Sequence, residues 1–264
     1  MNNINKRNRK KEKEIIFGIP GMCSLSGTSN YMHPLMKHLQ YMTGIESMPI
    51  DLPHHNDSQY LSIMNIEKYI NQIYEEILKI MEEKKKNKTH IVGHSMGATI
   101  GSGVESCIEN HQSINMGKLI TINAPYTYEG TDVFSKGAAL LFSAGPIFQP
   151  GTFTYNEKLA KWLICNDMSD QDADKAIKGL GPESKKVLWD YLFKRFKIES
   201  PERNPEDRLH IASSQDHIVP NEISQKIATI TGGHYEEIPG GHHSVVSTTA
   251  KETAELIAEL TDLG

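Results

Sequence analysis

Short apolar runs rich in β-branched residues alternate along this chain with longer segments of helical periodicity. The clearest helix is predicted over residues 65–84, where Tyr69, Ile73 and Ile77 recur every four residues among Glu and Lys. Further helices are predicted over residues 30–39, 96–108 and 251–260. Strands are predicted over residues 14–17, 47–50, 89–92, 118–122, 208–212 and 235–238. This alternation predicts an α/β fold with a mostly parallel sheet of about six strands and helices on both faces.

The alternation stops between residue 123 and about residue 204. This stretch shows no convincing strand of the main sheet, and it carries an apolar segment, residues 138–148, followed by three helix-like patterns. We interpret it as a helical cap over the carboxyl edge of the sheet, where open α/β sheets bind their ligands. The predicted division is therefore a basic tail (1–13), a core (14–126 and 205–264) and a cap (127–204).

One short motif carries the strongest chemical information in the chain. Gly93-His94-Ser95-Met96-Gly97 follows a predicted strand and opens a predicted helix. In such a turn the central residue adopts strained backbone angles, and small flanking residues let the strand and the helix pass closely. The hydroxyl then stands exposed above the sheet, near a helix N-terminus that favours negative charge. We predict that Ser95 is a catalytic nucleophile.

A serine hydroxyl needs an adjacent base to attack at neutral pH. Among the twelve histidines, His242 is the best candidate, because it follows the last predicted strand in a glycine-containing loop that can carry it over the sheet edge. His243 is the neighbour with which it is most easily confused. The histidines at positions 54, 55, 94 and 234 are assigned to loop, elbow or surface positions.

The base must itself be oriented, and a carboxylate usually does this. Asp216 follows the strand predicted over residues 208–212, in a short polar turn that leads into Ile218, Val219 and Pro220. The resulting chain order, Ser95, Asp216, His242, differs from the orders of chymotrypsin-like and subtilisin-like enzymes and matches the order expected of the predicted fold. If Asp216 does not serve, the next candidates are Asp167, Asp170 and Asp132.

A tetrahedral intermediate also needs donors for its oxyanion. The first predicted donor is the main-chain N–H of Met96, the residue after the nucleophile. The second is expected in the glycine-rich loop after the first strand, where Pro20 has no N–H to give. We assign it to Ile19, with Met22 as the alternative.

Composition and charge narrow the range of partners. The formal net charge of −5 gives no electrostatic reason to expect nucleic acid or an anionic membrane surface. No apolar run is long enough to cross a bilayer, and the charged start lacks the apolar region of a signal peptide. Three widely spaced cysteines suit a reducing cytoplasm, and no histidine cluster has the spacing of metal ligands. We therefore expect a cytoplasmic enzyme without a metal.

Taken together, these residues resemble the α/β-hydrolase superfamily. Residues 17–21 resemble its His-Gly-x-Pro-Gly loop, with Phe17 where histidine is common, and residues 51–58 resemble its Asp-Leu-Pro-Gly-His-Gly-x-Ser stretch. Residues 165–183 and 241–247 are similar to the cap and histidine loop of the small esterase and hydroxynitrile-lyase branch. The resemblance implies a six-stranded sheet, no cofactor and a buried pocket under the cap.

The same three residues serve several reactions, so alternatives remain open. The first hypothesis is hydrolysis of a small or medium, mostly apolar carboxylic ester through an acyl-serine intermediate. The second is a thioesterase or acyl-transfer role in a biosynthetic pathway, in which lysines of the predicted cap dock an acidic carrier. The third is a lyase or cyclase without an acyl-enzyme, and the fourth is a binding protein that keeps the residues as a ligand clamp.

Overall fold

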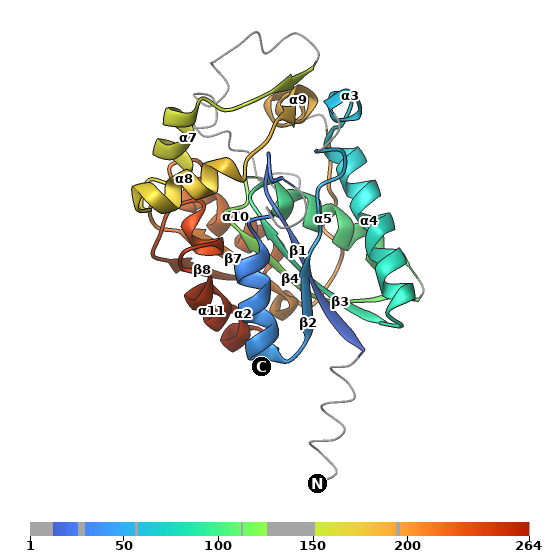
Figure 1. Ribbon diagram of the computed structural model, residues 1–264. Helices are drawn as coiled ribbons and strands as arrows, with labels where there is room; N and C mark the ends of the chain where they lie inside the picture. Colours follow the sequence, from blue (N-terminus) through green and yellow to red (C-terminus); the bar gives the residue numbers. More distant parts are fainter. Residues whose placement is uncertain are drawn as a thin grey trace.

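The computed structural model describes residues 13–25, 30–55, 58–111, 113–125, 151–193 and 196–263. Its main sheet has six strands in the order β2-β1-β3-β4-β7-β8, and every neighbouring pair is parallel (Figure 1). The predicted α/β fold is confirmed. The strands are β1 (Glu14–Ile19), β2 (Glu46–Pro49), β3 (Lys88–His94), β4 (Asn115–Ile122), β7 (Arg208–Ser213) and β8 (His234–Ile238).

Alternating side chains of the strands face two separate hydrophobic clusters, one on each side of the sheet. In β1, Ile15, Phe17 and Ile19 enter one cluster while Ile16 enters the other. Burial of both faces explains why the strands are continuous apolar runs. Helices α4 (Ile66–Glu83), α5 (Met96–Glu109) and α10 (Asn221–Thr231) pack on the first cluster, and α2 (His33–Thr43) and α11 (Ala250–Leu260) pack on the second.

The start of α2 differs from the prediction for residues 30–39. Asn30 lies outside the helix, because its side chain is bonded elsewhere: Oδ1 accepts from the N–H of Met32, and Nδ2 donates to the carbonyl of Ile50. The helix ends at Thr43 and is followed by Gly44, which adopts a left-handed conformation with φ of 68°. A short helix, α3 (Ser58–Leu61), was not predicted.

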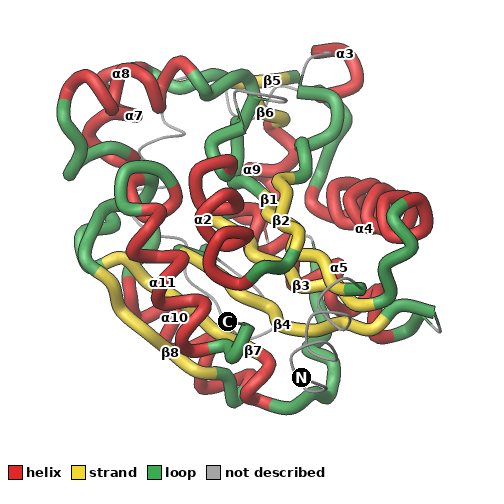
Figure 2. The backbone as a smooth tube through the Cα atoms, turned by 60° about the horizontal axis from the view of Figure 1, so that its bottom comes forward, coloured by secondary structure: helices red, strands yellow, loops and turns green. Residues whose placement is uncertain are grey.

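The segment between β4 and β7 contains α7 (Glu157–Ile164), α8 (Asp170–Lys178) and α9 (Lys185–Phe193). Figures 1 and 2 show these helices beyond the end of the sheet at which β1 finishes. The segment also contains β5 (Thr152–Phe153) and β6 (Glu183–Ser184), an antiparallel pair separate from the main sheet. The pattern missed these two strands because two residues are too short to show a period. The apolar segment 138–148 lies outside the described residues, and the division into core and cap remains a prediction.

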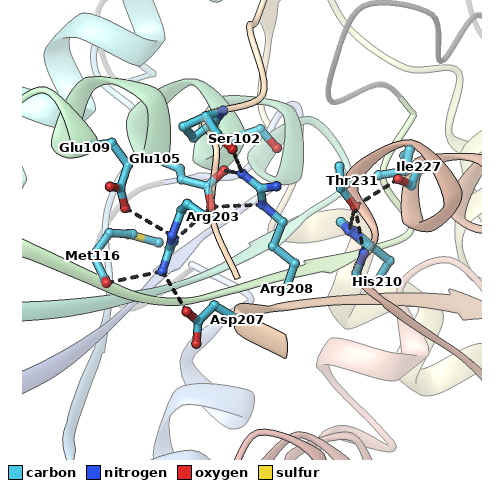
Figure 3. Close-up of polar contacts among 12 residues, drawn as sticks. Ser102, Glu105, Glu109, Met116, Arg203, Asp207, Arg208, His210, Ile227 and Thr231 are labelled. Atoms are coloured by element: carbon cyan, nitrogen blue, oxygen red, sulfur yellow. Dashed lines mark hydrogen bonds and ion pairs between the residues drawn. The ribbon is translucent and has the colours of Figure 1, made fainter. Parts of the chain in front are cut away.

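A buried ion cluster ties α5 to the beginning of β7, at the other end of the sheet (Figure 3). Glu105 has no exposed side-chain surface, and its carboxylate accepts from Nη1 of Arg203 at 2.9 Å and from Nη2 of Arg208 at 3.1 Å. Two guanidinium groups satisfy both carboxylate oxygens, so the buried charge is compensated. The cluster fixes the entry of β7, whose opposite end leads to Asp216. Among the described helices, none combines the length and apolarity needed to cross a membrane.

Candidate active site

Ser95 occupies a strained turn between β3 and α5. Its backbone has φ of 54° and ψ of −124°, a conformation that side-chain-bearing residues rarely adopt. A Cβ on Gly93 would lie 2.5 Å from Cα of Ala98, and a Cβ on Gly97 would collide with the carbonyls of Ile19 and Pro20. These close approaches explain why both flanking positions are glycine, as the sequence predicted.

The topology places this turn where open sheets bind ligands. After β1 the chain passes to β2 on one side, and it then returns to form β3 on the other side of β1. The strand order therefore reverses between β1 and β3, and a crevice forms outside the carboxyl ends of strands at such a point. Ser95 follows β3 at this crevice, and its main-chain N–H donates to the carbonyl of Ile122 at 2.9 Å.

His242 and Asp216, predicted from separate loops, lie together after β8 and β7. Nδ1 of His242 is 2.7 Å from Oδ2 of Asp216, and their side chains are 5% and 0% exposed. Oδ1 of Asp216 accepts from the N–H groups of Ile218 at 2.6 Å and Val219 at 2.9 Å. The carboxylate is thus held by its own turn, and it fixes the ring orientation of His242.

His243 faces a different environment from its neighbour. Its ring meets that of Tyr31 edge-on, with centroids 4.5 Å apart, and its N–H donates to the carbonyl of Ile164. Burial, with a smaller contribution from the nearby charge of His242, lowers the pKa of His243 to about 3. His243 therefore stays neutral within the protein, while His242 is the member of the pair that contacts the carboxylate.

Of the alternative acids, the two that the structure describes, Asp167 and Asp170, have no recorded contact with the ring of His242. Asp167 accepts from the main-chain N–H of Gly241 at 2.7 Å, so its carboxylate holds the histidine loop from outside. Asp170 begins α8 and is exposed. Asp132 lies outside the described residues.

The predicted oxyanion donors lie on two segments that pack closely. Met96 is the first residue of α5, where main-chain N–H groups have no partner within the helix. The loop after β1 contacts this turn, because a Cβ on Gly21 would lie 2.8 Å from Cβ of Ser95. The N–H of Gly21 donates to the hydroxyl of Tyr31. The assignment of the second donor to Ile19 or Met22 remains a prediction.

Three residues around the site were not recognised from the sequence. His94, assigned there to an elbow position without a role, is 1% exposed and contacts both Tyr31 and the carbonyl of His242. Asn123, with φ of 51°, donates to the same carbonyl at 3.2 Å. His55 lies in a loop, as expected, but it is buried beside Glu183. The contacts of these three residues join segments that are distant in the sequence. No local sequence pattern therefore indicates their roles.

Cys23 is the cysteine nearest in sequence to the loop after β1, and its surroundings do not favour a reactive thiolate. Cys23 follows the loop after β1 but is fully buried, and burial together with the charge of Glu183 raises the pKa of its thiol well above the ordinary value. Within the described ranges, no group of three or more His, Cys, Asp or Glu side chains is arranged to hold a metal ion.

Comparisons with known proteins bear on the fold and the family of this chain. Residues 16–170 match the family model described as palmitoyl protein thioesterase. No curated protein matches the sequence significantly. Similar solved structures include a mutant of polyneuridine aldehyde esterase, with a TM-score of 0.70, 16% identity and coverage of 94% of this chain and 100% of that one.

Two further structures extend the likeness. Tomato methylketone synthase I, complexed with 2-tridecanone, has a TM-score of 0.69 and 14% identity, covering 95% of this chain and 98% of that one. An extracellular α/β-hydrolase from a Paenibacillus species has a TM-score of 0.67 and 16% identity, covering 93% and 98%. At such identities the likeness establishes the α/β-hydrolase fold. Because the family model spans more than half of the chain, the protein belongs to the palmitoyl protein thioesterase family.

Proposed function

We propose that the protein is a serine hydrolase that cleaves an acyl ester through an acyl-enzyme on Ser95. The observation that carries this proposal is the buried His242–Asp216 pair, with 2.7 Å between Nδ1 and Oδ2. A ring held in this way presents Nε2 as the free, basic nitrogen. The strained turn at Ser95 lies on the same edge of the parallel sheet.

The proposed reaction has two steps. The hydroxyl oxygen of Ser95 attacks the acyl carbon while Nε2 of His242 takes the hydroxyl proton, and the leaving alcohol or thiol then departs with that proton. Water next attacks the acyl-serine, gives a proton to His242 and releases the carboxylic acid, with the proton returning to Ser95. The N–H groups of Met96 and Ile19 are the proposed donors to the oxyanion in both steps.

Two substrate classes remain in competition. A small or medium, mostly apolar carboxylic ester is the first candidate. An acyl thioester is the second, and the palmitoyl protein thioesterase match favours it. Lys161 is one of the lysines of the predicted cap, and it is less suited to dock an acidic carrier, because it already pairs with Glu157 at 3.4 Å and with Asp174.

The test compares ester and thioester substrates that carry the same acyl groups, from acetyl to palmitoyl. The wild-type protein should be labelled by a fluorophosphonate and should release product from at least one series. Ser95→Ala should abolish labelling and lower kcat by about 10⁴- to 10⁶-fold. Retention of more than about a tenth of the activity, under about 1.4 kcal/mol of barrier, would remove Ser95 from the mechanism. A wild-type protein that is neither labelled nor active on either series would favour the lyase or the ligand-binding alternative.

A further inference from the structure

The imidazole of His94 lies buried between two segments of the active site. Its Nδ1 is 3.0 Å from the hydroxyl of Tyr31, and its Nε2 is 2.7 Å from the main-chain carbonyl oxygen of His242. Only 1% of the residue is exposed. The side chain of the residue before the proposed nucleophile therefore contacts the main chain of the proposed base.

The partners of His94 define where its proton lies. A carbonyl oxygen can only accept, so Nε2 must carry the hydrogen. Burial lowers the pKa of His94 well below the ordinary value, and the ring is neutral. Nδ1 is then an acceptor, and the hydroxyl of Tyr31 donates to it.

The same network reaches the loop after β1. The hydroxyl of Tyr31 has one hydrogen, which goes to His94, and its oxygen accepts from the N–H of Gly21. Hydrogen bonds consequently run in one direction from Gly21, through Tyr31 and His94, to the carbonyl of His242. Each group in this series of hydrogen bonds has a fixed donor or acceptor role. Exchanging that role would leave a partner unsatisfied.

The carbonyl of His242 is held from two sides. His94 donates to it from the turn after β3, and Nδ2 of Asn123 donates to it at 3.2 Å from the residue after β4. Asp216 separately fixes the ring at Nδ1. Main chain and ring together determine where Nε2 of His242 points, and displacement of a catalytic group by about 1 Å can cost about 100-fold in rate.

We propose that His94 is a positioning residue, which donates from Nε2 to the carbonyl of His242 and thereby places the base relative to Ser95 and the loop after β1. This inference rests on the proposed function, because it assigns the base role to His242. It adds a role for a side chain that packs beside the ring of His242, with ring centroids 4.8 Å apart, and that takes no part in the proposed bond-making steps.

The test compares two substitutions at one position. His94→Leu keeps the approximate volume and removes the donor, while His94→Gln keeps an N–H donor near the position of Nε2. We expect His94→Leu to lower kcat and the rate of fluorophosphonate labelling by about 10- to 100-fold, with KM changed less than about threefold. His94→Gln should restore both rates to within about threefold of wild type.

A matched control separates positioning from general damage. His210 is also a fully buried histidine, bonded through both ring nitrogens to Thr121 and Thr231, and it lies within β7 away from Ser95. His210→Leu should lower stability but leave kcat of the folded protein unchanged. A His94→Leu protein with wild-type kcat, or equal losses in the Leu and Gln variants, would overturn the proposal.

A second measurement does not depend on turnover or on the folding of the Leu variant. In Ser95→Ala protein, ¹⁵N NMR of the His94 ring should show a neutral imidazole protonated at Nε2 at pH 6, assigned by its absence in the Ser95→Ala, His94→Gln double variant. A protonated ring or an Nδ1–H tautomer would contradict the proposal. Failure of the proposed function is distinct, since it would appear as ester turnover by Ser95→Ala itself, or as a wild-type protein that is neither labelled nor active.

Discussion

His242 and Asp216 meet across 2.7 Å although they come from two different loops, and each is also anchored by its own surroundings. Asp216 receives two main-chain N–H groups through Oδ1, which leaves Oδ2 for the histidine. The carbonyl of His242 receives two side-chain donors. The pair is therefore preorganised on both sides, and small changes to either member should be visible in the rate.

Asp216→Asn should lower kcat by at least about 100-fold, and by up to about 10⁴-fold as in the serine-protease case. The amide keeps the size and the Oδ1 acceptor but loses the charge, and its NH₂ group facing Nδ1 favours the wrong tautomer of His242. Steady-state ester hydrolysis and fluorophosphonate labelling should fall in parallel.

Asp167→Asn is the matched control for this change. Its side chain accepts from the N–H of Gly241, and an amide oxygen preserves that bond, so activity should stay near wild type. Normal turnover by Asp216→Asn, with loss in Asp167→Asn, would mean that the acid had been assigned to the wrong loop.

His242→Ala and His243→Ala should differ sharply in activity. His242 contacts the carboxylate, whereas the ring of His243 packs against Tyr31 and has no contact with Asp216 among the described interactions. We expect near-complete loss of kcat for His242→Ala, and a modest loss of activity with lower thermal stability for His243→Ala, because the latter leaves a cavity. The measurements are kcat and the thermal midpoint of both variants. The reverse order of activities would assign the role of the base to His243.

Acid should destabilise the fold below about pH 6.5. Burial lowers the pKa of His210 and of His243 to about 3, so the unfolded chain binds protons that the folded state excludes. Their stabilising contribution is complete above the unfolded pKa of about 6.5 and declines as the pH falls toward the folded value. Between pH 7 and pH 5, each histidine should cost about 2 kcal/mol of unfolding free energy.

Urea unfolding at pH 7 and pH 5 measures this loss directly. His210→Gln removes one of the titrating histidines. The difference in unfolding free energy between pH 7 and pH 5 should therefore be smaller in this variant than in the wild type. An unfolding free energy that is equal at both pH values, or higher at pH 5, would contradict the assignment of these histidines as buried and neutral.

Glu183→Gln should destabilise the contact between the β5–β6 segment and the core. The fully buried carboxylate accepts from the N–H of Cys23 at 3.1 Å and from the hydroxyl of Tyr69 at 2.8 Å, and its Oε2 lies 3.2 Å from Nε2 of His55. An amide turns one acceptor into a donor that faces other donors. The expected loss is about 2–4 kcal/mol of unfolding free energy.

Glu157→Gln provides the comparison, since this glutamate lies on α7 with a side chain 69% exposed. Glu157→Gln should lower the unfolding free energy by no more than about 0.5 kcal/mol. If the two substitutions have similar effects in chemical denaturation, Glu183 does not hold the segment to the core.

The elements that the sequence determined by itself are those with a local cause. Strand and helix periods, the glycines on either side of Ser95 and the turn after each parallel strand all act within a few residues, so their patterns are legible in the chain. Because carboxyl ends of parallel strands share one edge, the loops that carry Ser95, Asp216 and His242 were also expected there.

The sequence named Asp216 and His242 as partners, but only the tertiary structure decided which other contacts hold these side chains in place. His94 and the carbonyl of His242 are 148 residues apart, and Glu183 contacts Cys23 across 160 residues. The choice of Asp216 over Asp167, and the different surroundings of His242 and His243, depend on the direction in which each loop turns. Such directions follow from packing and from the need to satisfy buried donors and acceptors, neither of which leaves a periodic pattern in the chain.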